Sequence, residues 1–349
     1  MKKKSLNAKN KIRNLILRHL NDKKIFEIYK IFKNSLNINK KYAVAVSGGA
    51  DSLSLAFLTK CFSIINKVDV KFYLIDHKLR KNSSSEAKTV VSVLEKFNIN
   101  CKIISWNGEK PFSNIQAIAR DKRYTLLTNQ CKKDKIENLL LGHHIDDLYE
   151  NFLIRLLRGS GLKGLTSFGE TSEYKKNKIN ILRPLINFEK KRLIYLSSKV
   201  FNFFISDLSN LNENFKRIRI RNLIKNLEKE GLDKKKFRLT INNLKESDRS
   251  INFYVKGNIK KNSKFFEKKN TYLLNQNFFE QPNEIALRSL SFIMKSLSKK
   301  DYPPRGKKIN QLISKIKSNN IFKKITLGEC FIEKVNKTML ISRENPTKK

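Results

Sequence analysis

Cysteine is scarce in this chain of 349 residues, and no segment is long and apolar enough to cross a membrane. The chain has four cysteines: Cys61, Cys101, Cys131 and Cys330. They lie far apart and form no Cys-x-x-Cys pair, which disfavours a structural zinc site or a redox pair and predicts buried or spare thiols. The longest apolar runs lie in segments such as 53–58, whereas a membrane-spanning helix needs about 18 consecutive apolar residues. An integral membrane protein is therefore excluded.

The basic start of the chain also lacks a signal-peptide core. Its apolar stretch is interrupted by Arg18 and His19 and is too short for a secretory signal. We expect a cytoplasmic protein.

Acidic residues are few, with 31 aspartates and glutamates against 74 lysines and arginines, which gives a formal net charge of +43 at pH 7. A chain this basic favours a polyanionic partner, with nucleic acid as the first candidate. A composition rich in lysine, asparagine and isoleucine also arises from an AT-rich genome, so part of the excess can be solvated surface. Hydrophobic residues make up 40% of the chain, which excludes a fully disordered protein.

Apolar runs and amphipathic segments alternate between residue 42 and about residue 200. Four continuous apolar runs are typical of parallel strands buried on both faces: 43–46, 70–76, 101–104 and 138–142. Four segments with apolar residues at three- and four-residue spacing are expected to be helices: 53–65, 86–97, 115–131 and 146–157. The alternation predicts an α/β fold with a doubly wound parallel sheet, whose ligands bind at the carboxyl ends of the strands.

The chain length predicts about two domains, and the composition divides the chain further. We expect an N-terminal helical extension, the α/β domain, a mostly helical domain and a small C-terminal α+β module at 1–38, 39–215, 216–300 and 301–349. Pro303, Pro304 and Gly306 mark the last boundary. The Lys-rich run at 255–269 is of low complexity and is assigned no contact.

The strongest motif follows the run at 43–46 and reads Ser47-Gly48-Gly49-Ala50-Asp51-Ser52. Its glycines allow a tight turn that aims backbone amides at an anion, the next helix adds its N-terminal dipole, and two serines add hydroxyls. The lysine of a Walker loop is missing. Asp51 would repel a phosphate but suits a Mg²⁺ ion held on it. A strand-to-helix turn capped by serine and aspartate is the structural alternative.

Carboxylates gather after the fourth run. Asp146, Asp147 and Glu150 open a helix, and Glu150 shares a helical face with each of the other two. Clustered carboxylates need a cation, and both Mg²⁺ and an amine fit. Asp147 or Glu150 could take a proton from such an amine. A helix-start group stabilised by the helix dipole is the alternative.

Histidines and arginines complete the candidate set. Arg120 and Arg123 lie three apart on one helix and fit a clamp on phosphates or on a charged intermediate, with an ordinary solvated face as the alternative. Adjacent His143 and His144 point opposite ways at a strand end, with no third soft ligand near, which disfavours zinc. We interpret them as hydrogen-bonding partners of a nucleotide or nucleobase, or as structural histidines.

A basic segment begins near residue 216. Its arginines alternate with isoleucines, and these arginines are Arg217, Arg219 and Arg221. Tracking an RNA backbone is the functional interpretation, and a solvated helix is the alternative.

These residues resemble known motifs. Ser47 to Ser52, placed after a strand, resembles the SGGxDS signature of the PP-loop ATP pyrophosphatases. Three further segments resemble the DHxLR, ARxxRY and GHHxDDxxE motifs of the tRNA(Ile)-lysidine synthase family: Asp76-His77 with Leu79-Arg80, Ala119-Arg120 with Arg123-Tyr124, and 142–150. The same family's RGSGxxGL, RPL, DPSN and RNRIR stretches correspond to 158–165, 183–185, 207–210 and 217–221. Leu208 replaces the family's Pro and Ile218 its Asn; the likeness covers about residues 40–225 and is weak in the C-terminal module.

The resemblance implies a reaction and its participants. ATP with Mg²⁺ adenylates the 2-oxygen of the wobble cytidine in the CAU anticodon of tRNA(Ile), and the ε-amine of free L-lysine displaces AMP to give lysidine. It implies catalytic roles for Asp51, Arg120, Arg123, Asp147 and Glu150. ATP would be held by Ser47, Gly48, Gly49, Ala50, Asp51, Ser52, Asp76, His77 and His143, the metal by Asp51, and tRNA by Arg217, Arg219 and Arg221. A homodimer is left open.

Three other functions are weighed against this one. PP-loop enzymes that thiolate tRNA attack the same atom, but sulfur delivery generally needs paired or catalytic cysteines, and none of the four here is so arranged. A synthetase with a small-molecule acceptor would not need a basic helical domain. An RNA-binding protein that keeps the nucleotide fold as a scaffold has no use for intact Asp51, Asp147 and Glu150.

Overall fold

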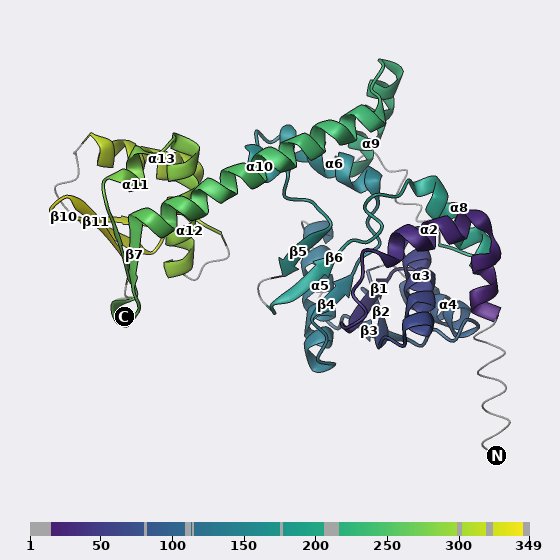
Figure 1. Ribbon diagram of the computed structural model, residues 1–349. Coiled ribbons are helices and arrows are strands. Elements are labelled where there is room, and N and C mark those ends of the chain that lie inside the picture. The colour runs from purple at the N-terminus through teal and green to yellow at the C-terminus, as the bar shows by residue number, and fades with distance from the viewer. Residues whose placement is uncertain are drawn as a thin grey trace. The chain divides into compact units, whose positions relative to one another are not determined.

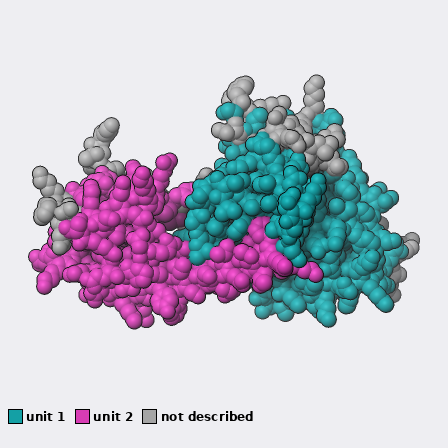
Figure 2. Space-filling model, turned by 90° about the horizontal axis from the view of Figure 1, so that it is seen from above, with its two compact units in different colours: residues 1–234 teal, residues 235–349 magenta. Residues whose placement is uncertain are grey.

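A computed structural model describes residues 15–79, 82–108, 113, 115–174, 177–205, 216–298, 302–318 and 324–344 (Figure 1). Arg80 and the motif at 207–210 lie outside the described residues. The chain divides into two compact units, 1–234 and 235–349, which Figure 2 colours separately. No described helix combines the length and the apolar character that crossing a bilayer requires.

A six-stranded sheet forms the centre of the first unit. Its strands are β1 (Tyr42–Val46), β2 (Val70–Asp76), β3 (Cys101–Ser105), β4 (Asn138–Leu140), β5 (Thr171–Tyr174) and β6 (Ile179–Leu182). They lie in the order β3-β2-β1-β4-β6-β5, and every neighbouring pair is parallel except β5 with β6. The doubly wound parallel sheet expected from the sequence is thereby confirmed, with one antiparallel edge strand added.

Helices cover both faces of this sheet. In chain order the first unit contains η1 (Arg18–Asn21), α2 (Lys23–Lys33), α3 (Ala50–Asn66), α4 (Ser83–Glu95), α5 (Ile115–Lys133), α6 (Ile145–Leu156), α7 (Leu162–Leu165), α8 (Lys190–Phe201) and α9 (Lys216–Lys229). Helices α3 and α4 contact one face and α5 the other. Alternate residues of β1 therefore enter different cores: Val44 packs with the α3 side and Ala43 with the α5 side, which explains the continuous apolar run.

The order of the strands creates a switch point between β1 and β4, where the winding of the chain reverses. The chain moves outward from β1 to β2 and β3, and then returns to place β4 on the opposite side of β1. In open α/β sheets, ligands bind beyond the carboxyl ends of the two strands where the winding reverses. Here those ends are the loop after Val46 and the loop after Leu140.

The second unit is an antiparallel sheet packed on helices. Helix α10 (Lys234–Asn262) starts at the boundary and leads into β7 (Ser263–Phe266), η3 (Glu267–Lys269), β8 (Thr271–Leu274), α11 (Asn277–Glu280), α12 (Asn283–Ser298), α13 (Gly306–Lys317), β9 (Ile325–Leu327), β10 (Cys330–Val335) and β11 (Thr338–Arg343). The strand order is β7-β8-β11-β10-β9. Side chains of α11, α12 and α13 and of one sheet face, such as Leu290 and Ile341, form its own core.

The division of the chain differs from the expected one. We expect a helical segment at 216–300 and a separate module that begins at 301, but β8 pairs with β11, so both segments share one sheet. Helix α9 packs on α6 and belongs with the first unit, not with the helical segment. The Lys-rich run at 255–269, for which the sequence predicts no specific contact, includes the end of α10 and β7, and β7 pairs with β8.

Candidate active site

The loop between β1 and α3 has the geometry of an anion cradle. Gly48 has φ +85°, and a Cβ built there would lie 2.6 Å from Val90 Cγ2 and 2.9 Å from Ile205 Cδ1, so only glycine fits. The Gly48 carbonyl accepts a hydrogen bond from the Ile205 N–H at 2.9 Å. Helix α3 begins at Ala50, which leaves its first amides and its dipole directed at this loop.

Serine hydroxyls fix the two sides of the loop. Ser52 Oγ accepts hydrogen bonds from the Ser47 N–H and the Ser47 hydroxyl, both at 3.1 Å, and donates to the Gly49 carbonyl at 3.0 Å. These hydrogen bonds hold the loop in its turn. This arrangement suits the preorganised phosphate cradle expected from the sequence.

The loop after β4, the strand next to β1, lies close to the loop between β1 and α3. A Cβ built at Gly142 would lie 3.1 Å from the backbone of Asp51 and Ser52. His144, which is buried, is the N-cap of α6: its Nδ1 accepts the Asp146 N–H at 3.3 Å, and its own N–H donates to Asp147 Oδ2 at 3.0 Å. The reciprocal pair fixes the start of α6 and sets its carboxylates beside the cradle.

Two carboxylates lie near His144, and their pKa values are shifted in opposite directions. His144 Nε2 lies 3.6 Å from Asp51 Oδ2 and 3.7 Å from Asp147 Oδ2. Burial raises the pKa of Asp51, although His144 and Lys190 oppose it. Burial acts the same way on Asp147, but His144, His143, the backbone hydrogen bond and Arg217 outweigh it and lower the pKa of Asp147. Such a separation is typical of carboxylates with different tasks.

Arginines of α9 reach the carboxylates of α6. Arg221 Nε donates to Glu150 Oε1, and Arg217 Nη1 lies 3.9 Å from Asp147 Oδ1. Glu150 is 2% exposed, and its burial raises the pKa of the carboxyl in spite of the hydrogen bond from Arg221. Asp146 faces Lys234 at 3.6 Å instead. Asp147 and Glu150 therefore both face arginines of α9.

A cationic group of side chains adjoins these carboxylates. Burial lowers the pKa of Arg123, and the nearby Arg120 lowers it further. The Arg183 guanidinium lies 4.7 Å from the centre of the Phe168 ring and donates to the Gly169 carbonyl and to Ser172 Oγ, both at 3.0 Å. Burial, helped by Arg183, lowers the pKa of His143 to about 3, so its ring is neutral at neutral pH. Buried guanidinium groups of this kind favour an anionic ligand.

The residues around Asp51 fit a Mg²⁺ ion held on phosphates. Asp51 Oδ1 is buried and makes no hydrogen bond within the described residues. In the same part of the chain, no three histidine, cysteine or acidic side chains are grouped to hold a metal on their own. Mg²⁺ at phosphate sites is bound by one or two carboxylates together with phosphate oxygens and water, so a single orphaned carboxylate oxygen beside a phosphate cradle matches this need.

The predicted site residues do not all contribute in the same way. Asp76 Oδ1 accepts the Lys78 N–H at 3.0 Å and its Oδ2 accepts the Ser84 hydroxyl, so this carboxylate is engaged by the backbone just after β2 and by the start of α4. His77 has a buried Nδ1 without a hydrogen bond among the described residues, and burial with Arg123 lowers its pKa. Arg217 and Arg221 face carboxylates, whereas Arg219 lies on the exposed side of α9.

His144 and Arg183 also lie at this site. The sequence leaves His144 open between a nucleotide contact and a structural histidine, and in the structure it caps α6. Arg183 belongs to the Arg-Pro-Leu motif, and the sequence pattern assigns it no role because β6 is not expected from it. Once β6 is known to lie beside β4, the residue after it must lie at the same sheet edge.

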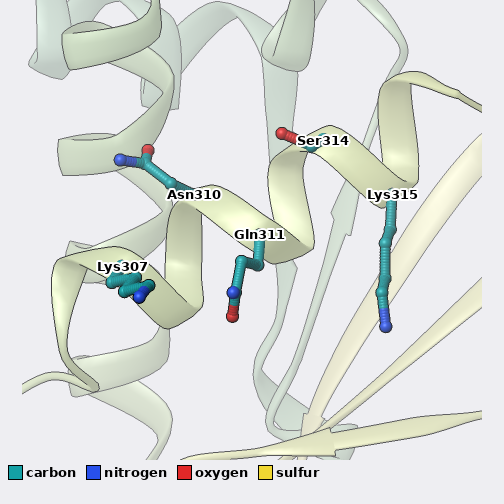
Figure 3. A pocket seen from close by; sticks show the side chains of 5 residues that line it. All are labelled: Lys307, Asn310, Gln311, Ser314 and Lys315. Carbon is teal, nitrogen blue, oxygen red and sulfur yellow. The ribbon is translucent and has the colours of Figure 1, made fainter.

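The second unit has a separate surface depression of about 720 Å³. Figure 3 shows the side chains that line it, and all come from α13: Lys307, Asn310, Gln311, Ser314 and Lys315. It contains no carboxylate and no buried polar group among these side chains, and it receives no catalytic assignment.

Comparison with known proteins identifies the fold class. A family model described as a PP-loop domain matches residues 20–228. Among solved structures, the U34-tRNA thiolase NcsA from Methanococcus maripaludis with its 4Fe-4S cluster is 18% identical, with 64% of this chain and 78% of that chain covered at a TM-score of 0.52. This likeness concerns the fold alone. The fold and the loop at Ser47–Ser52 define a PP-loop protein.

Curated relatives narrow the class to a family. The tRNA(Ile)-lysidine synthase of Wolbachia pipientis wMel is 32% identical over 91% of this chain and 75% of its own length. Those of the Wolbachia of Brugia malayi (strain TRS) and of Rickettsia typhi (strain ATCC VR-144 / Wilmington) are 32% and 33% identical, over 88% and 87% of this chain and 71% and 70% of their own lengths. The chain belongs to the tRNA(Ile)-lysidine synthase family.

Proposed function

We propose that this chain is an ATP-dependent ligase that joins the ε-amine of free L-lysine to C2 of the wobble cytidine in the CAU anticodon of tRNA(Ile). One observation carries the proposal. The phosphate cradle after β1 and the buried carboxylates of α6 meet at the switch point of the sheet, linked by His144, which lies within 3.7 Å of both Asp51 and Asp147. A nucleotide and an amine can therefore react in one site.

The first half-reaction activates the cytidine. Backbone amides of 47–52 and the N-terminus of α3 hold the ATP phosphates, and Asp51 Oδ1 would hold Mg²⁺. Magnesium supplies charge neutralisation on the phosphates when it is bound. The cytidine 2-oxygen forms a bond to the α-phosphorus of ATP, and the bond to pyrophosphate breaks. Arg120 and Arg123 offset the negative charge that develops.

The second half-reaction forms the C–N bond. The lysine ammonium has a pKa near 10.4 and must lose a proton before it attacks. Asp147, whose pKa is lowered, stays ionised and binds the ammonium, while Glu150, whose pKa is raised, accepts the proton. The free amine then attacks C2, and the C2–O bond breaks as AMP leaves.

The thiolation alternative is not favoured by any observation at the site. All four cysteines are buried and unpaired, and burial raises the pKa of each thiol. They lie on four different elements, α3, β3, α5 and β10. Sulfur transfer needs an accessible thiolate or a ligated cluster, and this distribution supplies neither.

The test is pyrophosphate release from ATP by the purified chain with lysine and CAU-anticodon tRNA(Ile), each component omitted in turn. Mass analysis of the wobble nucleoside identifies the product. We expect lysidine only when ATP, Mg²⁺, lysine and tRNA are all present. Turnover that needs tRNA but not lysine would contradict the lysine acceptor, and absence of turnover would leave an RNA-binding scaffold. A homodimer and a cytoplasmic location stay predictions of the sequence.

A further inference from the structure

Tyr124 lies where the buried face of α5 reaches the carboxyl ends of the strands. Leu127 and Cys131, which follow it on the same helical face, are buried in the core between α5 and the sheet. Tyr124 packs against the edge of this core, as do the second-to-last residues of β1, β2 and β3. Arg120 lies one turn before Tyr124 on that face. The helix face therefore changes from apolar to cationic at this tyrosine.

The Tyr124 ring is close to both guanidinium groups of the arginine clamp, which consists of Arg120 and Arg123. Their Cζ atoms lie 5.2 and 5.9 Å from the centre of the ring, and a ring face attracts a cation within about 6 Å. Arg120 Nη2 also donates a hydrogen bond to the Tyr124 hydroxyl at 3.3 Å. One phenol ring thus lies beside both cations of the clamp.

The edge hairpin of the sheet holds this ring in place. Tyr174, at the end of β5, stacks on Tyr124 with ring centres 5.9 Å apart and planes 15° from parallel. Its hydroxyl shares a hydrogen bond with Thr125 Oγ1 at 3.3 Å. Asn177, between β5 and β6, donates to Thr128 Oγ1 at 2.7 Å. The hairpin of β5 and β6 is therefore fixed to the stretch of α5 that carries Tyr124.

A ring holds a guanidinium group differently from a carboxylate. Arg217 and Arg221 of α9 face carboxylates of α6, which offset their positive charge. Neither Arg120 nor Arg123 forms such an ion pair with a carboxylate in the part of the chain that the structure describes. An aromatic face attracts a cation through its quadrupole and carries no net charge. The clamp therefore keeps its full positive charge for an anion.

We propose that Tyr124 is a positioning residue for the arginine clamp. Its ring, supported by Tyr174, holds the Arg120 and Arg123 guanidinium groups in the orientation in which they offset the charge that develops during adenylation. Groups that are preorganised in this way stabilise the transition state without first having to reorient. The catalytic consequence rests on the proposed function, whereas the placement of the guanidinium groups does not.

Four variants separate the ring from the space that it fills. Tyr124→Phe keeps the ring and removes the hydroxyl, whereas Tyr124→Leu keeps an apolar side chain and removes the ring. Tyr174→Leu removes only the stacking partner. Tyr195→Leu on α8 is the matched control, because Tyr195 also has a cation near its ring, Lys24 Nζ at 5.2 Å, and a hydroxyl that donates to Asp22, at the start of α2.

The experiment measures pyrophosphate release by the full chain at varied ATP with lysine and tRNA saturating, beside the melting temperature. For Tyr124→Leu we expect kcat to fall about 10- to 100-fold, with the KM for ATP within about twofold of the parent because the lost interaction acts on the transition state. We expect a smaller loss of kcat in Tyr174→Leu, and a kcat within about threefold of the parent in Tyr124→Phe. Tyr195→Leu should lower the melting temperature and leave kcat unchanged. A parent-like kcat in Tyr124→Leu, or an equal loss in Tyr124→Phe, would overturn the proposal.

A double variant shows whether Tyr124 acts through the clamp. If it does, Arg120→Gln combined with Tyr124→Leu should lose less kcat than the product of the two single losses. Losses that multiply would mean that Tyr124 acts by another route and would contradict the positioning role.

NMR of the chain labelled with nitrogen-15 arginine decides the geometry without any substrate. The Nε–H signals of Arg120 and Arg123, assigned by their loss in Arg120→Gln and Arg123→Gln, are expected to move in Tyr124→Leu, which removes the ring current, and to stay in Tyr124→Phe. Unchanged signals in Tyr124→Leu would refute the placement, whatever reaction the chain catalyses. If the parent forms no lysidine while the signals respond as expected, the proposed function fails and the placement of the guanidinium groups stands.

Discussion

At the scale of single residues, the proposed first half-reaction depends most directly on the charge of Asp51. Its Oδ1 is buried without a hydrogen bond in the described chain, and burial raises its pKa. Asp51→Asn is nearly isosteric and removes the charge that Mg²⁺ requires. We expect pyrophosphate release to fall below detection while tRNA affinity, measured by filter binding, stays within about twofold of the parent. Equal rates in variant and parent would remove Asp51 from the mechanism.

The ion pair between Glu150 and Arg221 gives a second prediction at this scale, which concerns stability. The two partners should respond differently to substitution because only Glu150 is fully buried. Arg221→Met leaves the Glu150 carboxylate, 2% exposed, without its guanidinium partner, and breaking a buried pair in this way costs about 3 kcal/mol. Glu150→Gln costs less, since Arg221 is 33% exposed and reaches water. In urea unfolding we expect the double variant to be more stable than Arg221→Met alone. Additive losses would show that the two side chains do not interact.

At the scale of elements, the turn between β1 and α3 depends on the left-handed backbone of Gly48. Alanine there meets Val90 and Ile205 and adopts a φ that costs about 1–2 kcal/mol. Because the loop must then move, we expect Gly48→Ala to slow pyrophosphate release about a hundredfold.

Gly257→Ala is the control for Gly48→Ala. Gly257 lies inside α10 with nothing within 4 Å of a built Cβ, so alanine should raise stability by about 0.5–1 kcal/mol and leave the rate unchanged. A normal rate in Gly48→Ala would mean that the loop does not hold the phosphates.

The start of α2 provides a pH-dependent prediction. Asp22 accepts the Tyr195 hydroxyl at 2.7 Å and caps α2, and these hydrogen bonds lower its pKa from 3.8. Because the folded pKa is the lower one, the stabilisation is complete above pH 3.8 and is lost as the pH falls through the folded value. We expect Asp22→Ala to cost about 1 kcal/mol at pH 7, with the difference from the parent shrinking toward pH 3 in thermal melts. A difference that stays constant over this range would contradict the ionised cap.

The position of each strand in its sheet explains which strands can be predicted from the sequence. The four strands β1 to β4 are continuous apolar runs because helices cover both of their faces, and this pattern is visible in the sequence. In contrast, β5 and β7 read Thr-Ser-Glu-Tyr and Ser-Lys-Phe-Phe, and both are sheet edges whose polar or exposed side chains carry no such signal. The ion pair between Glu150 and Arg221 joins residues 71 positions apart, so it depends on α9 packing on α6 and could not be derived from local spacing.

At the scale of the whole molecule, the chain combines two units with separate cores and a net charge of +43. Two cores need not unfold together, so a melt of the full chain is expected to depart from a single two-state transition. Calorimetry checks this, because a calorimetric enthalpy equal to the van't Hoff enthalpy would show that both units unfold as one.

The high positive charge predicts that tRNA affinity depends strongly on salt concentration. Each phosphate that the protein neutralises releases counterions, so the logarithm of tRNA affinity falls linearly with the logarithm of salt concentration. With about 6–10 phosphate contacts, affinity should fall by about 10³ to 10⁵-fold between 50 and 200 mM salt. Arg219→Gln, on the exposed side of α9, should lower the slope by about one, whereas Asp51→Asn should not change it. If tRNA affinity did not depend on salt, the basic residues would not contact tRNA phosphates and would only form solvated surface. Binding of tRNA would then depend on base contacts alone.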